Sequence, residues 1–153
     1  MAGLAYDSVA EVLYGYLSRN NELVALDLAT GALEILGPIV GRELRALAYH
    51  PVENQLYGID GDAQLVAIDP ATREASVVGS VAFSNLTDLT YDVLTDLFYS
   101  IDRSGPHRLI AIDPESGTGQ AIGSDLPAFV ERLAIGDAGV LYGMNRGSTE
   151  LYT

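Results

Sequence analysis

The sequence lacks several residues on which common protein chemistry depends. It contains no cysteine, which excludes disulfides, thiol nucleophiles and thiolate metal sites. It also contains no lysine, because all eight basic residues are arginines, and this excludes Schiff-base chemistry and the lysine of a phosphate-binding loop. Its two histidines are too few for a three-histidine metal centre. We therefore expect no cofactor.

Positive charge and long apolar runs are also scarce. Twenty-one carboxylates and eight arginines give a formal charge of −13 over 153 residues, the wrong sign for holding a phosphate backbone, so we expect no nucleic-acid partner. No apolar run is long enough to span a membrane, and the N-terminus has no signal-peptide pattern. Because 48% of the residues are apolar, we expect a globular protein with an acidic surface and not a disordered acidic tail.

The sequence that remains is repetitive. The motif LAYD at residues 4–7 recurs as LAYH at 47–50, as LTYD at 89–92 and, in degenerate form, as LAIGD at 133–137. Further motifs follow it in step, in the order LYG, LVALD and ILG in the first repeat and as close variants in later ones. Successive copies are 43, 42 and 44 residues apart. A fixed period of this length indicates a chain built from copies of one structural unit.

Each repeat holds short apolar runs separated by turn residues, which is typical of strands rather than helices. The runs at 65–68 and 109–112 are apolar at every position, so both faces of their sheet must be covered. Four-stranded antiparallel meanders that are covered on both faces and repeat every 40 to 45 residues, roughly, are blades of a β-propeller. The sequence therefore predicts an all-β propeller arc with three complete blades and an incomplete fourth.

We place the blades at about 3–40, 45–81, 87–125 and 131–153, all within a single domain. The turns inside them have a physical explanation. In the turns that begin at Asp69 and Asp113, the carboxylate can accept backbone N–H bonds. Gly31 and Gly117 then supply the left-handed residue of a tight hairpin, and Arg73 takes that place in the second blade.

The consensus of these motifs resembles a bacterial family of propeller repeats of the YVTN and NHL type, and the resemblance covers essentially the whole chain. It implies a binding scaffold in a secreted or periplasmic location. A few related propellers are lyases, lactonases or cyclotransferases. The chain has neither the tryptophan motifs of quinone-binding propellers nor the Trp-Asp pair of WD repeats, because it contains no tryptophan.

An arc with an incomplete last blade exposes an apolar sheet face at each end, and such faces imply a partner. Two copies related by a two-fold axis would close a homodimeric ring of seven or eight blades, which is the arrangement that we expect. Two alternatives remain open at this point. The chain could close as a four-bladed monomer, or it could be a piece of a longer polypeptide.

A few residues could carry chemistry. His50 stands where other repeats have Asp, so we interpret it as a turn residue and not as a catalytic base. His107 lies in a loop that is longer than its equivalents, where it is either a ligand-binding residue or a surface residue. Asp60 and Asp62 resemble the start of a calcium loop but lack its further ligands, so we predict no metal site and hold these two residues as weak candidates.

The segments that vary between repeats are the connections between blades, at 40–45, 82–88 and 128–132. In propellers these connections gather on one rim around the central channel, where aromatic and charged side chains could form a recognition surface. The alternative for Phe83 and Phe129 is that they fill gaps between neighbouring blades. The candidate ligand-binding residues are Arg42, Arg45, Phe83, Asp88, His107, Phe129 and Glu131.

Clear structural repeats without a recognisable catalytic motif favour a non-catalytic binding scaffold for a protein, peptide or carbohydrate partner. The alternative is a propeller enzyme, such as a lyase or lactonase, with its site in the central channel. An enzyme of that kind needs convergent polar groups from several blades, whereas a scaffold does not.

Overall fold

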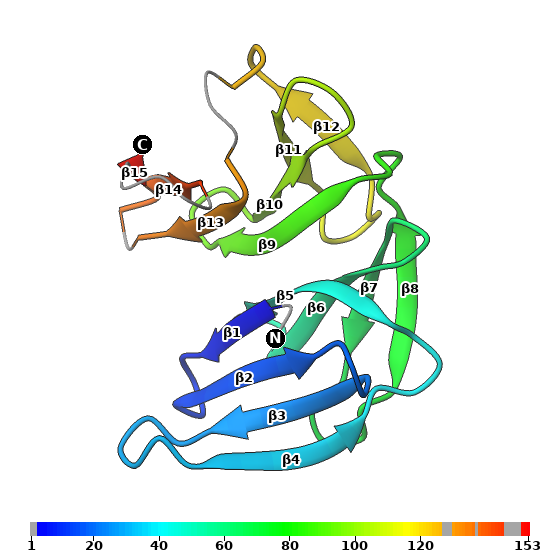
Figure 1. Ribbon diagram of the computed structural model, residues 1–153, viewed down its shortest axis with the longest axis vertical. Coiled ribbons are helices and arrows are strands. Elements are labelled where there is room, and N and C mark those ends of the chain that lie inside the picture. Colours follow the sequence, from blue (N-terminus) through cyan, green and yellow to red (C-terminus); the bar gives the residue numbers. More distant parts are fainter. Residues whose placement is uncertain (1–2, 127–129, 137, 146–150) are drawn as a thin grey trace.

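The computed structural model describes residues 3–126, 130–136, 138–145 and 151–153. All regular structure in this part of the chain is strand, arranged as four antiparallel sheets that form the blades of a propeller (Figure 1). Blade 1 consists of β1 (Gly3–Asp7), β2 (Val12–Leu17), β3 (Glu22–Leu26) and β4 (Leu33–Pro38). Blade 2 consists of β5 (Leu44–His50), β6 (Gln55–Asp60), β7 (Gln64–Ile68) and β8 (Ala75–Ser80).

The second half of the chain continues the pattern. Blade 3 consists of β9 (Leu86–Asp92), β10 (Leu97–Asp102), β11 (Arg108–Ile112) and β12 (Gly119–Ile122). Blade 4 has three strands in the described residues: β13 (Arg132–Ile135), β14 (Leu141–Met144) and β15 (Leu151–Tyr152). In every sheet each strand pairs with its neighbour in sequence. The predicted all-β propeller of four-stranded meanders is therefore confirmed.

The innermost strands β1, β5, β9 and β13 bring the blades together at the centre of the molecule (Figure 1). β5 packs between β1 and β9, and β13 packs on β9. Blade 2 is thus covered on both faces, which explains why its strands are apolar at successive positions. Tyr57, Val66 and Ile68 of this blade are all buried.

The turns between the third and fourth strands also follow the predicted chemistry. The Oδ1 atoms of Asp27, Asp69 and Asp113 each accept two backbone N–H groups. These hydrogen bonds lower the pKa of Asp27 and Asp113, because they favour the ionised carboxylate. Arg73 has φ +62°, close to the +71° of Gly117 at the same place in blade 3. The arginine therefore adopts a left-handed conformation that glycine reaches without steric cost.

Blades 2 and 3 lie very close together at Gly79. A Cβ atom added there would overlap the carbonyl oxygen of Ser116, in a turn of the next blade. We expect Gly79→Ala to lower the free energy of unfolding by about 1–3 kcal/mol, because blade 3 must shift to make room. Gly61→Ala is the matched control, since a Cβ at Gly61 meets open space. Urea unfolding checks this, and equal stability of the two variants would contradict the close approach.

Within the described residues, the structure has no helix long and apolar enough to cross a membrane.

Candidate functional site

The connections between blades and the turns between second and third strands lie on the same edge of the propeller, which we call the loop rim. Equivalent backbone hydrogen bonds join the two kinds of loop in each complete blade. The N–H groups of Ile39, Val81 and Leu126 donate to carbonyl groups across the rim at 2.7 to 3.0 Å. The predicted ligand-binding residues lie on this rim or beside it, except Phe129, which lies outside the described residues.

Arg42 and Asp60 form an ion pair on the rim of blade 2. The Arg42 guanidinium donates to Asp60 Oδ2 at 2.6 Å and to Gln64 Oε1 at 2.8 Å. Asp60 Oδ1 accepts the backbone N–H groups of Asp62 and Gln64. The buried Asp60 carboxylate is therefore already engaged by the turn and by Arg42. Among the described residues, no group of three or more His, Asp or Glu side chains is placed to hold a metal ion.

Arg45 connects the rims of two blades. Its guanidinium donates to the carbonyl oxygens of Gly61, in blade 2, and of Ser84, in the connection to blade 3. Arg45 occupies a bulge in β5, where the direction of a side chain departs from the regular alternation of the strand. Arg45 is exposed, so its guanidinium can also meet a ligand above the rim.

Phe83 packs against the core between blades 2 and 3 and also contributes to the rim surface. Its ring contacts the buried cluster of that junction. The Arg108 guanidinium lies 5.9 Å from the ring centroid, a cation–π distance, and also pairs with Asp102 at 3.3 Å. Both roles considered for Phe83, gap filling and surface recognition, are thus compatible with its position.

His107 is buried, so it is not the surface residue that was considered as an alternative. Its Nδ1 lies 2.9 Å from the carbonyl oxygen of Val130, in the connection to blade 4. Nearby, Arg103 and Glu131 form an ion pair at 3.4 Å across the same two segments. These contacts place His107 and Glu131 together where the rim passes from blade 3 to blade 4.

Asp88 connects the inner strands of blades 3 and 4. It lies in a bulge of β9 with φ +58°, and its Oδ2 accepts the backbone N–H of Leu133 in β13 at 2.8 Å. Burial raises the pKa of this carboxyl, although the N–H donors of Leu133 and Leu89 and the nearby charge of Arg132 favour its ionised form.

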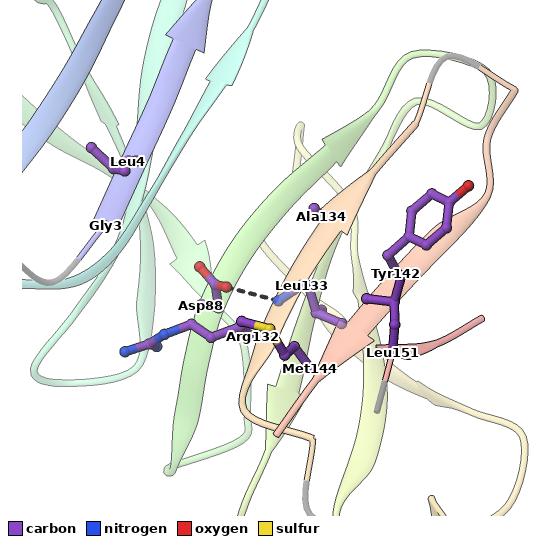
Figure 2. Close-up of a pocket in the computed structure, with 9 residues that line it drawn as sticks. All are labelled: Gly3, Leu4, Asp88, Arg132, Leu133, Ala134, Tyr142, Met144 and Leu151. Atoms are coloured by element: carbon purple, nitrogen blue, oxygen red, sulfur yellow. Dashed lines mark hydrogen bonds between the residues drawn. The ribbon is translucent and has the colours of Figure 1, made fainter. Parts of the chain in front are cut away.

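A cavity of about 520 Å³ lies between blade 4 and blade 1 (Figure 2). Asp88 and Arg132 contribute charged side chains to its lining, and apolar side chains form most of the remainder. It is lined by Gly3, Leu4, Asp88, Arg132, Leu133, Ala134, Tyr142, Met144 and Leu151. Among the described residues, the strands of blade 1 pack closely on those of blade 2 but not on those of blade 4.

His50 lies on the opposite edge of the propeller and acts as a turn residue, as predicted. In blades 1 and 3 the carboxylates of Asp7 and Asp92 accept backbone N–H groups of the turn that follows. In blade 2 the Nδ1 atom of His50 accepts the Glu53 N–H at 3.2 Å instead. The ring also stacks on Tyr91, with 4.1 Å between the centroids. His50 thus replaces the aspartate both as a cap and as a core residue.

Several functional candidates were not found from the sequence. Arg103 and Arg108 were not among the candidate residues, yet both fix the rim through ion pairs. Asp102 could have been found, because it occupies the same repeat position as Asp60. Arg132 lacked any such signal, since its position holds a different residue in each repeat.

No family model and no curated protein sequence matches this chain. Solved structures do match it, at low sequence identity. A chain in the crystal structure of a nidogen/laminin complex has a TM-score of 0.76 and 13% identity, over 94% of this chain and 56% of that chain. TolB from Acinetobacter baumannii has a TM-score of 0.65 and 17% identity, over 97% of this chain and 38% of that chain.

A third match is the computationally designed Ika4 protein, with a TM-score of 0.60 and 16% identity, over 99% of this chain and 89% of that chain. At these identities the likeness shows the β-propeller fold alone. The chain spans only about half of the nidogen/laminin chain and less of TolB.

Proposed function

We propose that the chain is a non-catalytic binding propeller whose loop rim contacts a protein, peptide or carbohydrate partner. The observation that carries this proposal is that side chains tie the rims of successive blades into one surface. Arg45 joins blades 2 and 3. The Arg103–Glu131 pair joins the loop between β10 and β11 of blade 3 to the connection that leads into blade 4. Loops that are fixed before binding lose little conformational entropy when a partner docks.

The chemistry of this rim suits a partner with both apolar and polar groups. Phe83 offers a half-buried aromatic ring, and Arg45 offers an exposed guanidinium that donates to the carbonyl oxygen of Ser84, the residue next to Phe83. Aromatic and arginine side chains are the commonest anchors of recognition surfaces. The similarity in fold to a chain of a nidogen/laminin complex supports a binding role in this chain by analogy.

Peptide and glycan arrays probed with the purified protein test this function. We expect Arg45→Ala and Phe83→Ala each to weaken binding to the selected ligands about tenfold or more, as for recognition anchors. Val52→Ala is the control, because Val52 is exposed on the turn between β5 and β6, at the other end of these strands from the loop rim. Loss of binding in the control alone would place the site on the opposite edge and overturn the proposal.

A propeller enzyme with a site in the central channel is the second candidate. Asp88 favours it, because a carboxyl group whose pKa is raised by burial beside a cavity is typical of general acids and bases. Hydrolysis of a lactone panel by the wild-type protein but not by Asp88→Asn would support the enzyme over the scaffold.

We also propose that the chain assembles as a homodimeric ring of seven or eight blades. The apolar side chains that remain exposed at the two ends of the arc support this, because a partner that covers them removes their surface from water. Light scattering at micromolar concentration should give twice the 16.3 kDa of one chain. A well-folded monomer would leave the four-bladed monomer as the better description.

A further inference from the structure

The outer face of blade 1 consists of residues that are buried at the equivalent places in blades 2 and 3. The repeats align Leu4 with Leu47 and Leu89. The exposed fraction of Leu47 is 0% and that of Leu89 is 3%, whereas that of Leu4 is 51%. Tyr6 is likewise half-exposed, although both of its equivalents are buried. We call this surface the leading face. It also includes Leu13, Val24, Leu26, Leu33 and Ile35.

The outer face of blade 4 corresponds to the other face of the repeated sheet, the face that packs on the following blade inside the chain. Met144 aligns with Ile59, and the two side chains are 50% and 1% exposed. Leu151 aligns with Leu65, and these two are 62% and 0% exposed. In blade 2 the equivalent residues pack on blade 3. We call this surface the trailing face. It also includes Ala134 and Tyr142.

At the junctions of blade 1 with blade 2 and of blade 2 with blade 3, a trailing face packs on a leading face. One buried cluster combines Tyr16 of the blade 1 trailing face with Leu47 of the blade 2 leading face. The next combines Ile59 with Leu89 in the same way. Ile101 and Leu133 line the space between blades 3 and 4. The packing of the repeat therefore pairs unlike faces, and the described residues expose one face of each kind, the leading face of blade 1 and the trailing face of blade 4.

We propose that the free leading face of one copy packs head to tail on the free trailing face of a second copy, with Leu4 of one copy against Met144 of the other. This proposal rests on the homodimeric ring proposed above and specifies how its two junctions form. Each copy provides both faces, so a two-fold axis makes the two junctions identical and leaves neither face exposed. Each exposed face is thus covered by a surface of the same kind as the one that covers the equivalent face at the junctions inside the chain.

The cavity between blades 4 and 1 supports a second copy over closure within one chain. Leu4 and Met144 both line it, but the two blades leave about 520 Å³ between them (Figure 2). Two junctions of several hundred Å² each fall, roughly, in the range of stable dimers.

Charge substitutions at the two faces test the docking. Leu4→Arg and Met144→Glu should each convert the dimer to a folded monomer of 16.3 kDa, because each places an unpaired charge in an apolar junction. Both side chains are half-exposed in the single chain, so circular dichroism and thermal unfolding should show that the variants still fold. Val52→Arg, on an exposed turn away from both faces, is the matched control and should remain a dimer.

The double variant L4R/M144E decides the orientation. In head-to-tail docking each junction places the new arginine against the new glutamate, so the dimer should return. A mixture of the two single variants should also form heterodimers through their one unaltered junction. If the leading face instead packed on itself, Met144→Glu alone would stay dimeric and the double variant would not recover, which overturns the proposal. A monomeric wild-type protein overturns the ring itself, and a dimer that survives both single substitutions overturns only this docking.

Discussion

Replacing Phe98 with alanine is expected to lower the free energy of unfolding by about 3–5 kcal/mol, the range for removing a buried aromatic side chain. Phe98 lies in the leading face of blade 3 and is fully buried. Its ring is 4.8 Å from Tyr57 and 6.0 Å from His50, measured between centroids, and both partners belong to blade 2. Alanine would leave a cavity at this junction and remove the ring contacts that connect the two blades. Urea denaturation measures the loss.

Phe98→Leu is the informative control, because Leu13, Leu56 and Leu141 occupy the same position in the other blades. A leucine keeps most of the volume, so we expect it to cost less than about 1.5 kcal/mol. If alanine and leucine were equally tolerated, the aromatic cluster would contribute little to the packing of blade 3 on blade 2.

A second large effect is expected at Ile68, on the face of blade 2 that packs against blade 1. Ile68 is fully buried in the cluster that includes Leu23 and Leu47. We expect Ile68→Ala to cost about 2–5 kcal/mol through cavity formation. Thermal and urea unfolding of wild type and variant provide the comparison.

Val52→Ala serves as the control for Ile68→Ala, since Val52 is an exposed apolar residue of the same blade and should change stability by less than about 0.5 kcal/mol. A cost below about 1 kcal/mol at Ile68 would argue against burial of both faces of blade 2, the property from which the propeller was first inferred.

The sequence predicted those parts of the fold that depend on local chemistry. Asp69 and Arg73 are enough to define a hairpin, because the carboxylate caps the backbone of its own turn and the fifth residue takes the left-handed conformation. The same applies to His50, whose place in the repeat predicted its role as a turn residue. The fixed period with which these local elements recur then predicts the blades.

The candidate site was less predictable, because its contacts connect residues far apart in the chain. Asp88 accepts a hydrogen bond from the backbone N–H of Leu133, 45 residues away. Asp88 itself has a left-handed conformation in a bulge, and no glycine or asparagine at this position predicts it from the sequence. Likewise Arg45 reaches Ser84, 39 residues away. Such contacts depend on the path of variable loops, where the repeat ceases to constrain the chain. The rim was therefore predicted as a region, while its pairings came only from the structure.

The strict pairing of each strand with its neighbour in sequence has a consequence for synthesis of the chain on the ribosome. All pairings within a blade are local, so a blade can form its sheet as soon as its last strand has emerged. The face of blade 1 that packs on Leu47 nevertheless stays bare until blade 2 follows. We expect each blade in turn to provide the surface on which the next blade folds and packs. The newest blade then carries the surface most prone to aggregation or to capture by chaperones.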